Sequence, residues 1–208
     1  GSVNFYTNVP GPVTADILSG GPDFKTEING SNVALICPSD GTYSAVQLRI
    51  RDVNGVAYTS SPINIVVDSG CPDVHILTPE PNSFVKNTFK FSGTVTDPSG
   101  IAKAEYSLDG ENWNNLPLTL TKKVAGTFSV TVDVSKYDDG YIPLDVRVYD
   151  TADNVGYDHS AISKDTVAPE AELILPEDSD IVNGKTLLVF KVTDNQYVDK
   201  AYYVAPAG

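Results

Sequence analysis

The sequence predicts an all-β protein made of tandem β-sandwich units, and three observations lead to this expectation. Val, Ile, Thr and Tyr fill most of the apolar positions, which is typical of strands. Turn residues, including 16 Gly and 14 Pro, separate the apolar runs, at about the 8–12-residue spacing of sandwich and barrel proteins. Long passages also repeat at one spacing, so the 208 residues hold more than one unit of the same kind.

The repeat is clearest around two prolines. Residues 71–80 align with residues 168–177, so that Pro72 and Pro169 are 97 residues apart. The same offset joins residues 95–97 to residues 192–194, both of which have the sequence VTD. Asp40-Gly41 matches Asp139-Gly140 at an offset of 99. One unit is therefore 97 to 99 residues long, close to the ~100 residues of a small sandwich domain.

This register divides the chain into three segments. Residues 72–168 are expected to form a complete domain, and residues 169–208 the first strands of a following domain. Residues 3–71 are either a domain that lacks its first strands or a shortened but complete one, and the sequence leaves both alternatives open. Because the chain contains no Met, we expect it to be an interior part of a longer protein.

Within the complete domain, the alternation of apolar and polar residues predicts seven strands. They are expected at residues 74–78, 88–96, 102–108, 116–120, 126–134, 142–149 and 158–164. Asp109-Gly110 predicts a tight hairpin turn after the third strand, because Gly accepts a positive φ. In residues 128–134 every second side chain is apolar, so one face of that strand is buried and the other faces water.

Several motifs follow one another along this domain. They are Val95-Thr96-Asp97-Pro98-Ser99-Gly100, Tyr106-Ser107-Leu108-Asp109-Gly110-Glu111-Asn112-Trp113, Asp139-Gly140, Leu144-Asp145-Val146-Arg147 and Asp150-Thr151-Ala152-Asp153-Asn154. With these motifs, residues 72–168 resemble the tandem bacterial Ig-like domains of secreted and cell-surface proteins. The sequence departs from the family at Asp153, where Gly is usual, and residues 3–71 lack the Asp-Gly-x-x-Trp hairpin. The resemblance implies an Ig-like sandwich that serves as a spacer, stalk or adhesion module, with no particular ligand.

The composition argues against several classes of function. With 14 Lys and Arg against 27 Asp and Glu, the net charge is −13, which argues against binding to nucleic acid or to an anionic membrane surface. The two histidines, His75 and His159, stand outside any catalytic motif. A narrow sandwich also offers few clefts for a pair of catalytic carboxylates. We therefore expect no enzyme activity and no catalytic residues.

The two cysteines, Cys37 and Cys71, are expected at one pole of the first segment, the end that faces the next domain. We expect a disulfide between them, worth about 3.5–4 kcal/mol in the loop-entropy description. An oxidising compartment would favour this bond. The alternative is two free thiols.

Oxygen-bearing side chains gather where the first segment meets the complete domain. The incoming linker and two turns of the domain carry Asp68, Asp73, Asp97, Asp150, Asp153 and Asn154. Calcium takes about six to eight oxygen ligands, so these residues predict a structural calcium site that stiffens the linker. The alternative is ordinary turn chemistry, because Asp and Asn bond to their own backbone in turns. We expect no other cofactor.

Trp113 follows the Asp109-Gly110 turn, and two interpretations are open for it. Either it covers a sheet edge, or it stands exposed as a platform that stacks on a sugar or a partner. In the second interpretation, Tyr137, Tyr141 and Tyr157 would extend the same ligand-binding surface.

Together these observations predict a non-enzymatic spacer or stalk of a large bacterial extracellular or cell-surface protein, which positions other domains. The alternative is adhesion or carbohydrate binding through exposed aromatic residues. The expected partners are neighbouring Ig-like domains of the same polypeptide and a protein or glycan ligand, but neither nucleic acid nor membrane. Because residues 169–208 would have open strand edges, they are also expected to complete residues 3–71 of another copy, head to tail.

Overall fold

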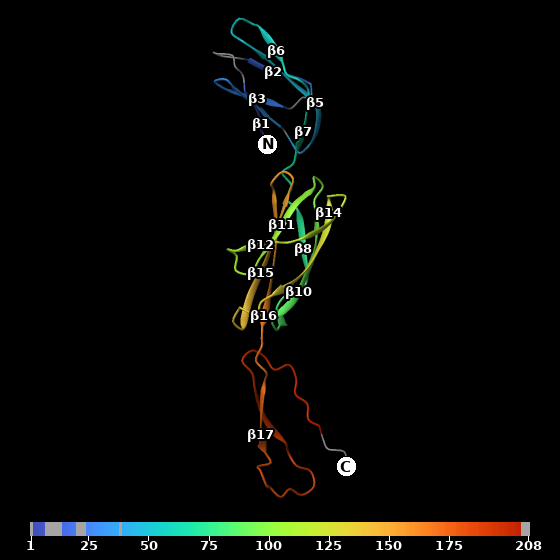
Figure 1. Cartoon of the computed structure of the whole chain (residues 1–208), viewed down its shortest axis with the longest axis vertical. Coiled ribbons are helices and arrows are strands. Elements are labelled where there is room, and N and C mark those ends of the chain that lie inside the picture. Colours follow the sequence, from blue (N-terminus) through green and yellow to red (C-terminus); the bar gives the residue numbers. More distant parts are fainter. Residues whose placement is uncertain (1, 7–13, 20–23, 38, 205–208) are drawn as a thin grey trace.

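The structure is a computed structural model that describes residues 2–6, 14–19, 24–37 and 39–204. Throughout these ranges the regular structure is β-strand, as the sequence predicts. Figure 1 shows three groups of strands that follow one another along the long axis of the molecule, joined by short linkers. No helix in the described ranges could cross a lipid bilayer.

The central group is a sandwich of two sheets. The first sheet has the order β13 (Leu118–Thr121), β14 (Ala125–Asp133), β10 (Thr88–Thr96) and β8 (Asp73–Thr78). The second has the order β12 (Trp113–Asn115), β11 (Ile101–Ser107), β15 (Gly140–Asp150), β16 (Val155–Lys164) and β9 (Ser83–Val85). Neighbouring strands are antiparallel except β16 and β9, which run parallel. The seven predicted strands are present, and the short strands β9 and β12 are additional.

The core of the central group lies between the two sheets and follows from the alternation of apolar residues. The ring of Phe91 on β10 lies 4.9 Å from the ring of Phe128 on β14 and 5.8 Å from that of Tyr106 on β11, centroid to centroid. Leu144 and Val146 of β15 are fully buried against these rings. The aromatic side chains therefore join the two sheets into one core.

Gly93, in the middle of β10, is required by this packing. A Cβ atom at this position would overlap the carbonyl of His75 on β8 and the ring of Phe128 on β14. The missing side chain therefore lets Phe128 fill the centre of the core while β8 lies close to β10.

The first group also has two sheets. One has the order β1 (Ser2–Tyr6), β4 (Asn32–Ile36) and β3 (Lys25–Asn29). The other has the order β2 (Thr14–Ser19), β5 (Gly41–Arg51) and β6 (Ala57–Thr59), and β7 (Ile63–Val67) pairs with β5 as well. One core cluster consists of Phe24, Leu35, Cys37, Val46 and Ile65, and a second contains Val33 and Leu48. In sequence β4 and β5 correspond to β14 and β15, so β1 takes the place of β10, and no described strand takes the place of β8.

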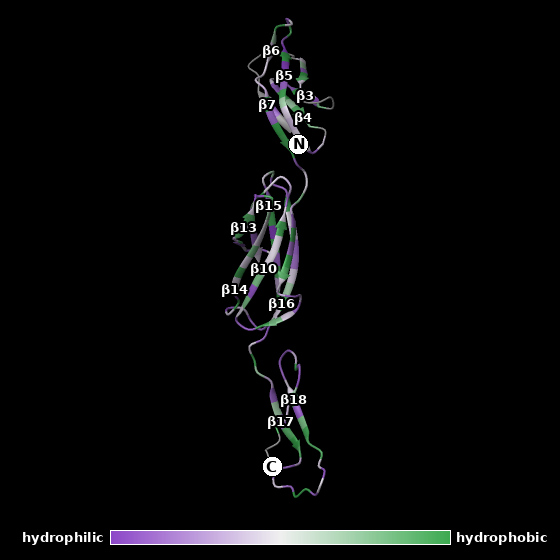
Figure 2. Ribbon diagram, turned by 90° about the vertical axis from the view of Figure 1, so that its right-hand side faces the viewer, coloured by the Kyte–Doolittle hydropathy of each residue, from purple (hydrophilic) through white to green (hydrophobic). Residues whose placement is uncertain are grey.

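The third group is a single antiparallel pair of strands, β17 (Glu170–Leu175) and β18 (Val189–Thr193). Glu170 lies opposite Thr193, just as Asp73 of β8 lies opposite Thr96 of β10. Figure 2 shows apolar stretches on both strands. Within the described ranges no other strand pairs with them.

Replacing Gly93 by Ala is expected to lower the free energy of unfolding of the central group by about 1–3 kcal/mol, because overpacking forces Phe128 or the backbone to move. Trp113 is the one tryptophan of the chain, so its fluorescence during urea unfolding reports this group alone. Thr88→Ala, at an exposed position of the same strand, serves as the control. A loss no larger than that of the control would contradict the role given to Gly93.

Candidate functional site

Three aspartates meet at the junction between the first and the central groups. Asp68 lies in the linker after β7, Asp97 follows β10, and Asp150 ends β15. Each offers one carboxylate oxygen, and the three oxygens lie within 4.8 Å of one another. Oxygens that share a calcium ion at about 2.3–2.6 Å can be separated by up to twice that distance. The spacing therefore fits a divalent cation.

The two carboxylates of the central group are deeply buried, since Asp97 is 2% and Asp150 0% exposed. Asp97 Oδ1 accepts hydrogen bonds from two N–H groups of its own turn, at 2.8 and 3.0 Å. Asp150 Oδ1 likewise accepts from two N–H groups of the next turn, at 2.7 and 2.8 Å. These bonds fold the two turns and fix both carboxylates at the pole that faces the first group.

Asp68 reaches this pole from the linker, and its carboxylate accepts fewer hydrogen bonds. Its Oδ1 accepts a hydrogen bond from the Gly70 N–H at 3.1 Å, while its Oδ2 is buried without a hydrogen-bond partner. Asn154 Nδ2 donates both to the Asp68 carbonyl at 3.1 Å and to Asp150 Oδ2 at 2.7 Å. A buried anionic oxygen without a partner costs free energy, and a cation between the carboxylates would offset that cost.

The structure brings together only part of the predicted calcium set. Asp68, Asp97 and Asp150 converge, and Asn154 turns its amide nitrogen toward them. Asp73, at the start of β8, instead pairs with His75 on the same exposed face, at 3.2 Å. Asp153 is exposed at the tip of its turn with a φ of 65°. This positive φ explains why Gly is usual at that position in the family pattern.

The first linker packs directly against the central group. Pro72 lies against Gly156 of β16 so closely that a Cβ atom at residue 156 would overlap the Pro72 carbonyl. Residue 156 must therefore be glycine for the linker to follow this path.

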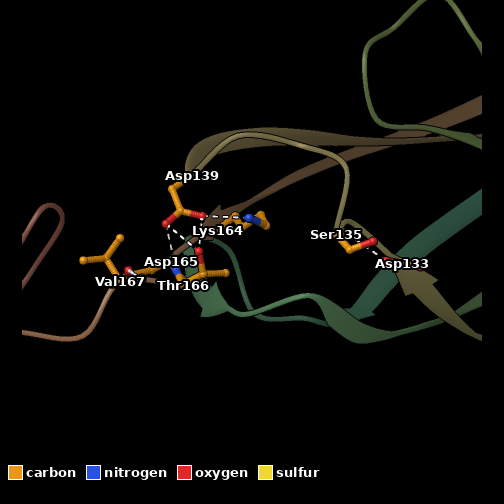
Figure 3. A network of polar contacts seen from close by, with 7 residues as sticks. All are labelled: Asp133, Ser135, Asp139, Lys164, Asp165, Thr166 and Val167. Atoms are coloured by element: carbon orange, nitrogen blue, oxygen red, sulfur yellow. Dashed lines mark hydrogen bonds and ion pairs between the residues drawn. The ribbon is translucent and has the colours of Figure 1, made fainter.

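At the opposite pole a second linker is bonded to the central group, as Figure 3 shows. Asp139 accepts hydrogen bonds from the Lys164 ammonium at 2.7 Å and from the Thr166 N–H at 2.8 Å. The Thr166 hydroxyl also donates to it, at 2.9–3.0 Å. The Lys164 ammonium, and after it the Thr166 N–H, lowers the pKa of Asp139 to about 2. We call Asp139, Lys164 and Thr166 the second linker clamp.

The first linker has a simpler clamp at the corresponding place. Asp40 aligns with Asp139, and the Ser69 hydroxyl donates to its carboxylate at 2.9–3.0 Å. We call Asp40 and Ser69 the first linker clamp. Sequence reasoning found the two Asp-Gly pairs as a repeat but missed this role. The available signal was that Ser69 and Thr166, both hydroxyl residues, are 97 residues apart.

Trp113 lies flat against a charged side chain of the second sheet. The Arg147 guanidinium carbon is 3.9 Å from the centroid of the indole ring, and Arg147 Nε donates to Glu105 at 2.7 Å. Lys103 binds the same carboxylate at 3.2 Å and lies 4.2 Å over the ring of Tyr149. Burial raises the pKa of Glu105, but the hydrogen bonds from Arg147 and Lys103 outweigh it and lower the pKa overall. This geometry favours the interpretation in which Trp113 covers the sheet, and not the one in which it stands exposed as a platform.

Of the other predicted ligand-binding aromatics, Tyr141 lies apart from Trp113 along the sheet. Trp113 lies opposite Ser107, which in turn lies opposite Asp145. Tyr141 is four residues further along β15, roughly 13 Å at the rise of a strand. Tyr137 and Tyr141 are 38% and 69% exposed. Tyr157 lies opposite Arg147 and stacks on His159 of its own strand.

The Asp109-Gly110 hairpin is a self-contained turn. Asp109 accepts hydrogen bonds from the N–H groups of Glu111 and Asn112 and from the Asn112 side chain, at 2.7–2.9 Å. The bonds from Asn112, more than any other contact, hold the pKa of Asp109 far below its usual range. Gly110 has a φ of 76°, as the turn prediction requires.

The predicted disulfide is not formed in the structure, which has Cys37 and Cys71 as free cysteines. The Cys37 side chain packs into the core of the first group beside Phe24 and Leu35. Cys71 is exposed on the linker. The prediction placed both residues near one pole but could not show that one side chain points inward and the other outward.

The two histidines form surface pairs. His75 lies 3.2 Å from Asp73, and His159 Nδ1 lies 2.7 Å from Asp145 Oδ1. Both histidine side chains are more than 60% exposed, so neither occupies a cleft.

Comparison with protein families matches residues 72–146 to a family described as bacterial Ig domain. The central domain is a bacterial Ig domain. The matched residues include β8 to β14 and the first half of β15, hence both Asp97 and Asp139. A comparison with curated proteins finds no match to this sequence.

Solved structures with a similar arrangement include the fibronectin(III)-like modules of Clostridium thermocellum CbhA, at 16% identity over 78% of this chain and 85% of that one, with a TM-score of 0.47. An I-band fragment of titin is 11% identical over 93% and 70% of the two chains, with a TM-score of 0.41. The endo-β-1,4-mannanase of Thermotoga petrophila is 13% identical over 48% of this chain, with a TM-score of 0.40, and only 21% of the enzyme is covered.

Replacing Arg147 by Met is expected to destabilise the bacterial Ig domain by about 1–2 kcal/mol, because it removes the stack on Trp113 and one partner of Glu105. Urea unfolding followed by Trp113 fluorescence measures the loss. Lys103→Met, which removes the more exposed partner of the same carboxylate, is the control and is expected to cost less.

The Arg147 effect is also expected to depend on pH. Because the pKa of folded Glu105 is below its ordinary 4.5, its pairing stabilises the domain fully above that value and is lost as the pH falls through the folded pKa. The difference between the wild type and Arg147→Met should therefore shrink as the pH falls below 4.5. A difference that stays unchanged from neutral pH down to the lowest pH at which the domain is folded would contradict the ion pair.

Proposed function

We propose that this chain is a non-enzymatic structural spacer of a large bacterial extracellular or cell-surface protein, and that it holds other domains at a fixed distance. The observation that carries the proposal is the pair of linker clamps. In each, the aspartate of an Asp-Gly turn binds the hydroxyl of the outgoing linker, Ser69 or Thr166. A linker that is bonded to the domain it leaves cannot swing freely, which is what a spacer requires.

Further contacts across both junctions support the same conclusion. Pro72 is seated on Gly156, and Asn154 binds the main chain of the linker at Asp68. At the second junction the ring of Phe84 on β9 stacks on Tyr197 of the third group, with centroids 6.3 Å apart. The net charge of −13 keeps neighbouring rods apart and soluble. Bacterial Ig domains are typically extracellular or on the surface, which fits the proposed location.

The alternative from the sequence, adhesion or carbohydrate binding, depends on a free aromatic platform. The ring of Trp113 is instead engaged by Arg147, and Tyr141 lies apart from it. We therefore favour the spacer.

We also propose that a divalent cation binds at the first junction. Because all the ligands there are oxygens, we propose calcium. Asp68 belongs to the linker, and Asp97 and Asp150 to the bacterial Ig domain. An ion bound by all three would join the linker to the domain and neutralise part of the charge collected there. The buried Asp68 Oδ2 without a partner supports this assignment.

Loss of the second linker clamp is expected to make the chain flexible. The double variant Asp139→Ala, Thr166→Val should show a broader distribution of dimensions and a smaller mean radius of gyration in small-angle X-ray scattering. Asp138→Ala, an exposed neighbour, is the control. Because the pKa of Asp139 is lowered from 3.8 to about 2, the clamp should persist in the wild type at pH 4 and be lost only as the pH approaches 2. Scattering curves that do not differ between variant and control would refute the clamp.

Calcium is expected to stabilise the bacterial Ig domain. With a dissociation constant of about 0.1 mM, the tight-binding end of the range for extracellular modules, 10 mM calcium would add about 2.7 kcal/mol to the free energy of unfolding. The comparison is urea unfolding by Trp113 fluorescence in calcium and in EDTA at equal ionic strength. Asp150→Asn should lose the response, while Asp153→Asn, outside the cluster, should retain it. No calcium effect on the wild type would overturn the cation site and leave the clamps untouched.

A further inference from the structure

Two of the three arginines of the chain lie side by side on the first group, on the sheet of β2, β5 and β6. Arg49 and Arg51 are two residues apart on β5, so both side chains leave the same face of the sheet. Arg49 lies between Asp16 of β2 and Thr59 of β6, and Arg51 lies opposite Thr14. Figure 1 shows β2 and β6 at the end of the first group that is farthest from the central group.

One carboxylate serves both guanidinium groups. Arg49 Nη2 donates to Asp16 Oδ2 at 3.2 Å, whereas Arg51 Nε is 3.8 Å from the same oxygen, beyond hydrogen-bond distance. Arg49 Nε is buried without a hydrogen-bond partner. The Arg51 guanidinium makes no hydrogen bond with the described residues, although its side chain is 39% exposed. Two cations and one carboxylate leave a surplus of one positive charge, together with unused N–H donors.

The bacterial Ig domain contains the same arrangement with its donors in use. Glu105 lies opposite Arg147 there, as Asp16 lies opposite Arg49 in the first group. Arg147 Nε donates to Glu105 at 2.7 Å, which is the bond that Arg49 Nε lacks. Lys103 supplies the second cation, at 3.2 Å from the same carboxylate. The comparison identifies the first group as the one with unsatisfied donors.

Aromatic rings cover the cations in the bacterial Ig domain. Trp113 lies against Arg147, and the Lys103 ammonium lies over the ring of Tyr149. The chain has no second tryptophan, and the residue 98 positions before Tyr149 is Arg51. Among the described residues, no aromatic ring lies over either arginine of the first group. These two guanidinium groups are therefore open to a ligand from solvent.

We propose that Arg49 and Arg51 bind the carboxylate of a sugar acid, such as a uronic acid unit of a glycan. The planar fork of a guanidinium group binds a carboxylate through two parallel hydrogen bonds. A surplus of one positive charge balances the single negative charge of a carboxylate, whereas a phosphate monoester carries about −1.5 to −2. The charge balance therefore selects the carboxylate.

The neighbouring hydroxyl groups favour a sugar as the carrier of that carboxylate. Thr14 and Thr59 are exposed and lie directly across from the two arginines. A uronic acid presents ring hydroxyls next to its carboxylate, and these can bond to both threonines. An acidic peptide presents its carboxylate on an aliphatic stem and leaves the threonine hydroxyls unused.

The site is compatible with the charge of the chain and goes beyond the proposed spacer function. The net charge of −13 is screened beyond about 8 Å at physiological ionic strength, so the local surplus of positive charge decides binding at this face. The site requires no aromatic platform. It would therefore add glycan binding to a spacer without using Trp113.

Arginine signals in NMR spectra of the full chain test the proposal. The three Nε–H signals are assigned with arginine variants and followed during titration with sodium glucuronate at constant ionic strength. The Arg49 and Arg51 signals should shift and saturate, while the signal of Arg147, which is bonded to Glu105, should stay in place. Neutral glucose should shift none of them. Glucuronate that leaves the Arg49 and Arg51 signals unchanged would overturn the proposal.

Charge-matched variants separate a site from a general effect of charge. Arg51→Met should weaken glucuronate binding about tenfold or more, because it removes charge-assisted hydrogen bonds. Arg51→Lys keeps the charge but lacks the planar fork, and should also weaken binding. Lys25→Met removes an exposed cation from the other sheet of the same group and should keep the affinity. The amide spectrum verifies that each variant is folded. Equal losses in Arg51→Met and Lys25→Met would refute a specific site.

Two further ligands test the carrier of the carboxylate. The amide of N-acetylglutamate presents the carboxylate of an acidic peptide, and inorganic phosphate presents a larger charge. Both are expected to bind more weakly than glucuronate. Equal or tighter binding of the glutamate derivative would assign the site to an acidic peptide and overturn the sugar acid, and tighter binding of phosphate would overturn the charge balance. None of these results bears on the linker clamps or on the cation site.

Discussion

One apolar layer between two sheets holds the bacterial Ig domain together, and the rest of the molecule depends on it. Phe91, Phe128 and Tyr106 meet across this layer, and Gly93 makes room for them. Because no polar group can enter such a layer without a partner, the charged residues of the domain collect on its outer faces and at its two poles. The poles are where linkers arrive and leave, so packing in the core decides which side chains meet the linkers.

Aspartate performs three structural tasks at these places. Asp109 closes a hairpin by accepting bonds from its own turn. Asp139 binds the outgoing linker together with Lys164. Asp97 and Asp150 are buried next to Asp68, where a cation would balance their charge. A chain with 27 acidic residues thus uses many of them as hydrogen-bond acceptors of turns and junctions, which is consistent with a structural module.

The sequence predicted the strands and the general position of the aspartates, because both depend on local patterns. Alternation in residues 128–134 identifies the buried face, and turns after the second and sixth strands of a sandwich share one pole, which brings Asp97 to Asp150. The direction of individual side chains was beyond such reasoning. Cys37 points into a core, Asp73 turns to His75, and a positive φ carries Asp153 outward. The stack of Arg147 on Trp113 depends on which strands are neighbours, and the short strand β12 was not predicted.

The parallel pairing of β9 with β16 has a mechanical consequence. The chain enters the domain at one pole and leaves it at the other (Figure 1), and β16 is the last strand before the exit. Tension on the two linkers would act directly on β8 and β16, and would reach β9, which follows β8, in the direction opposite to β16. Such a load is shared by the bonds that join the segments around them, from Asn82 to Ala161 and from Asp165 to Val85. Under such a load these bonds would share the force rather than break one after another, which would suit the proposed spacer.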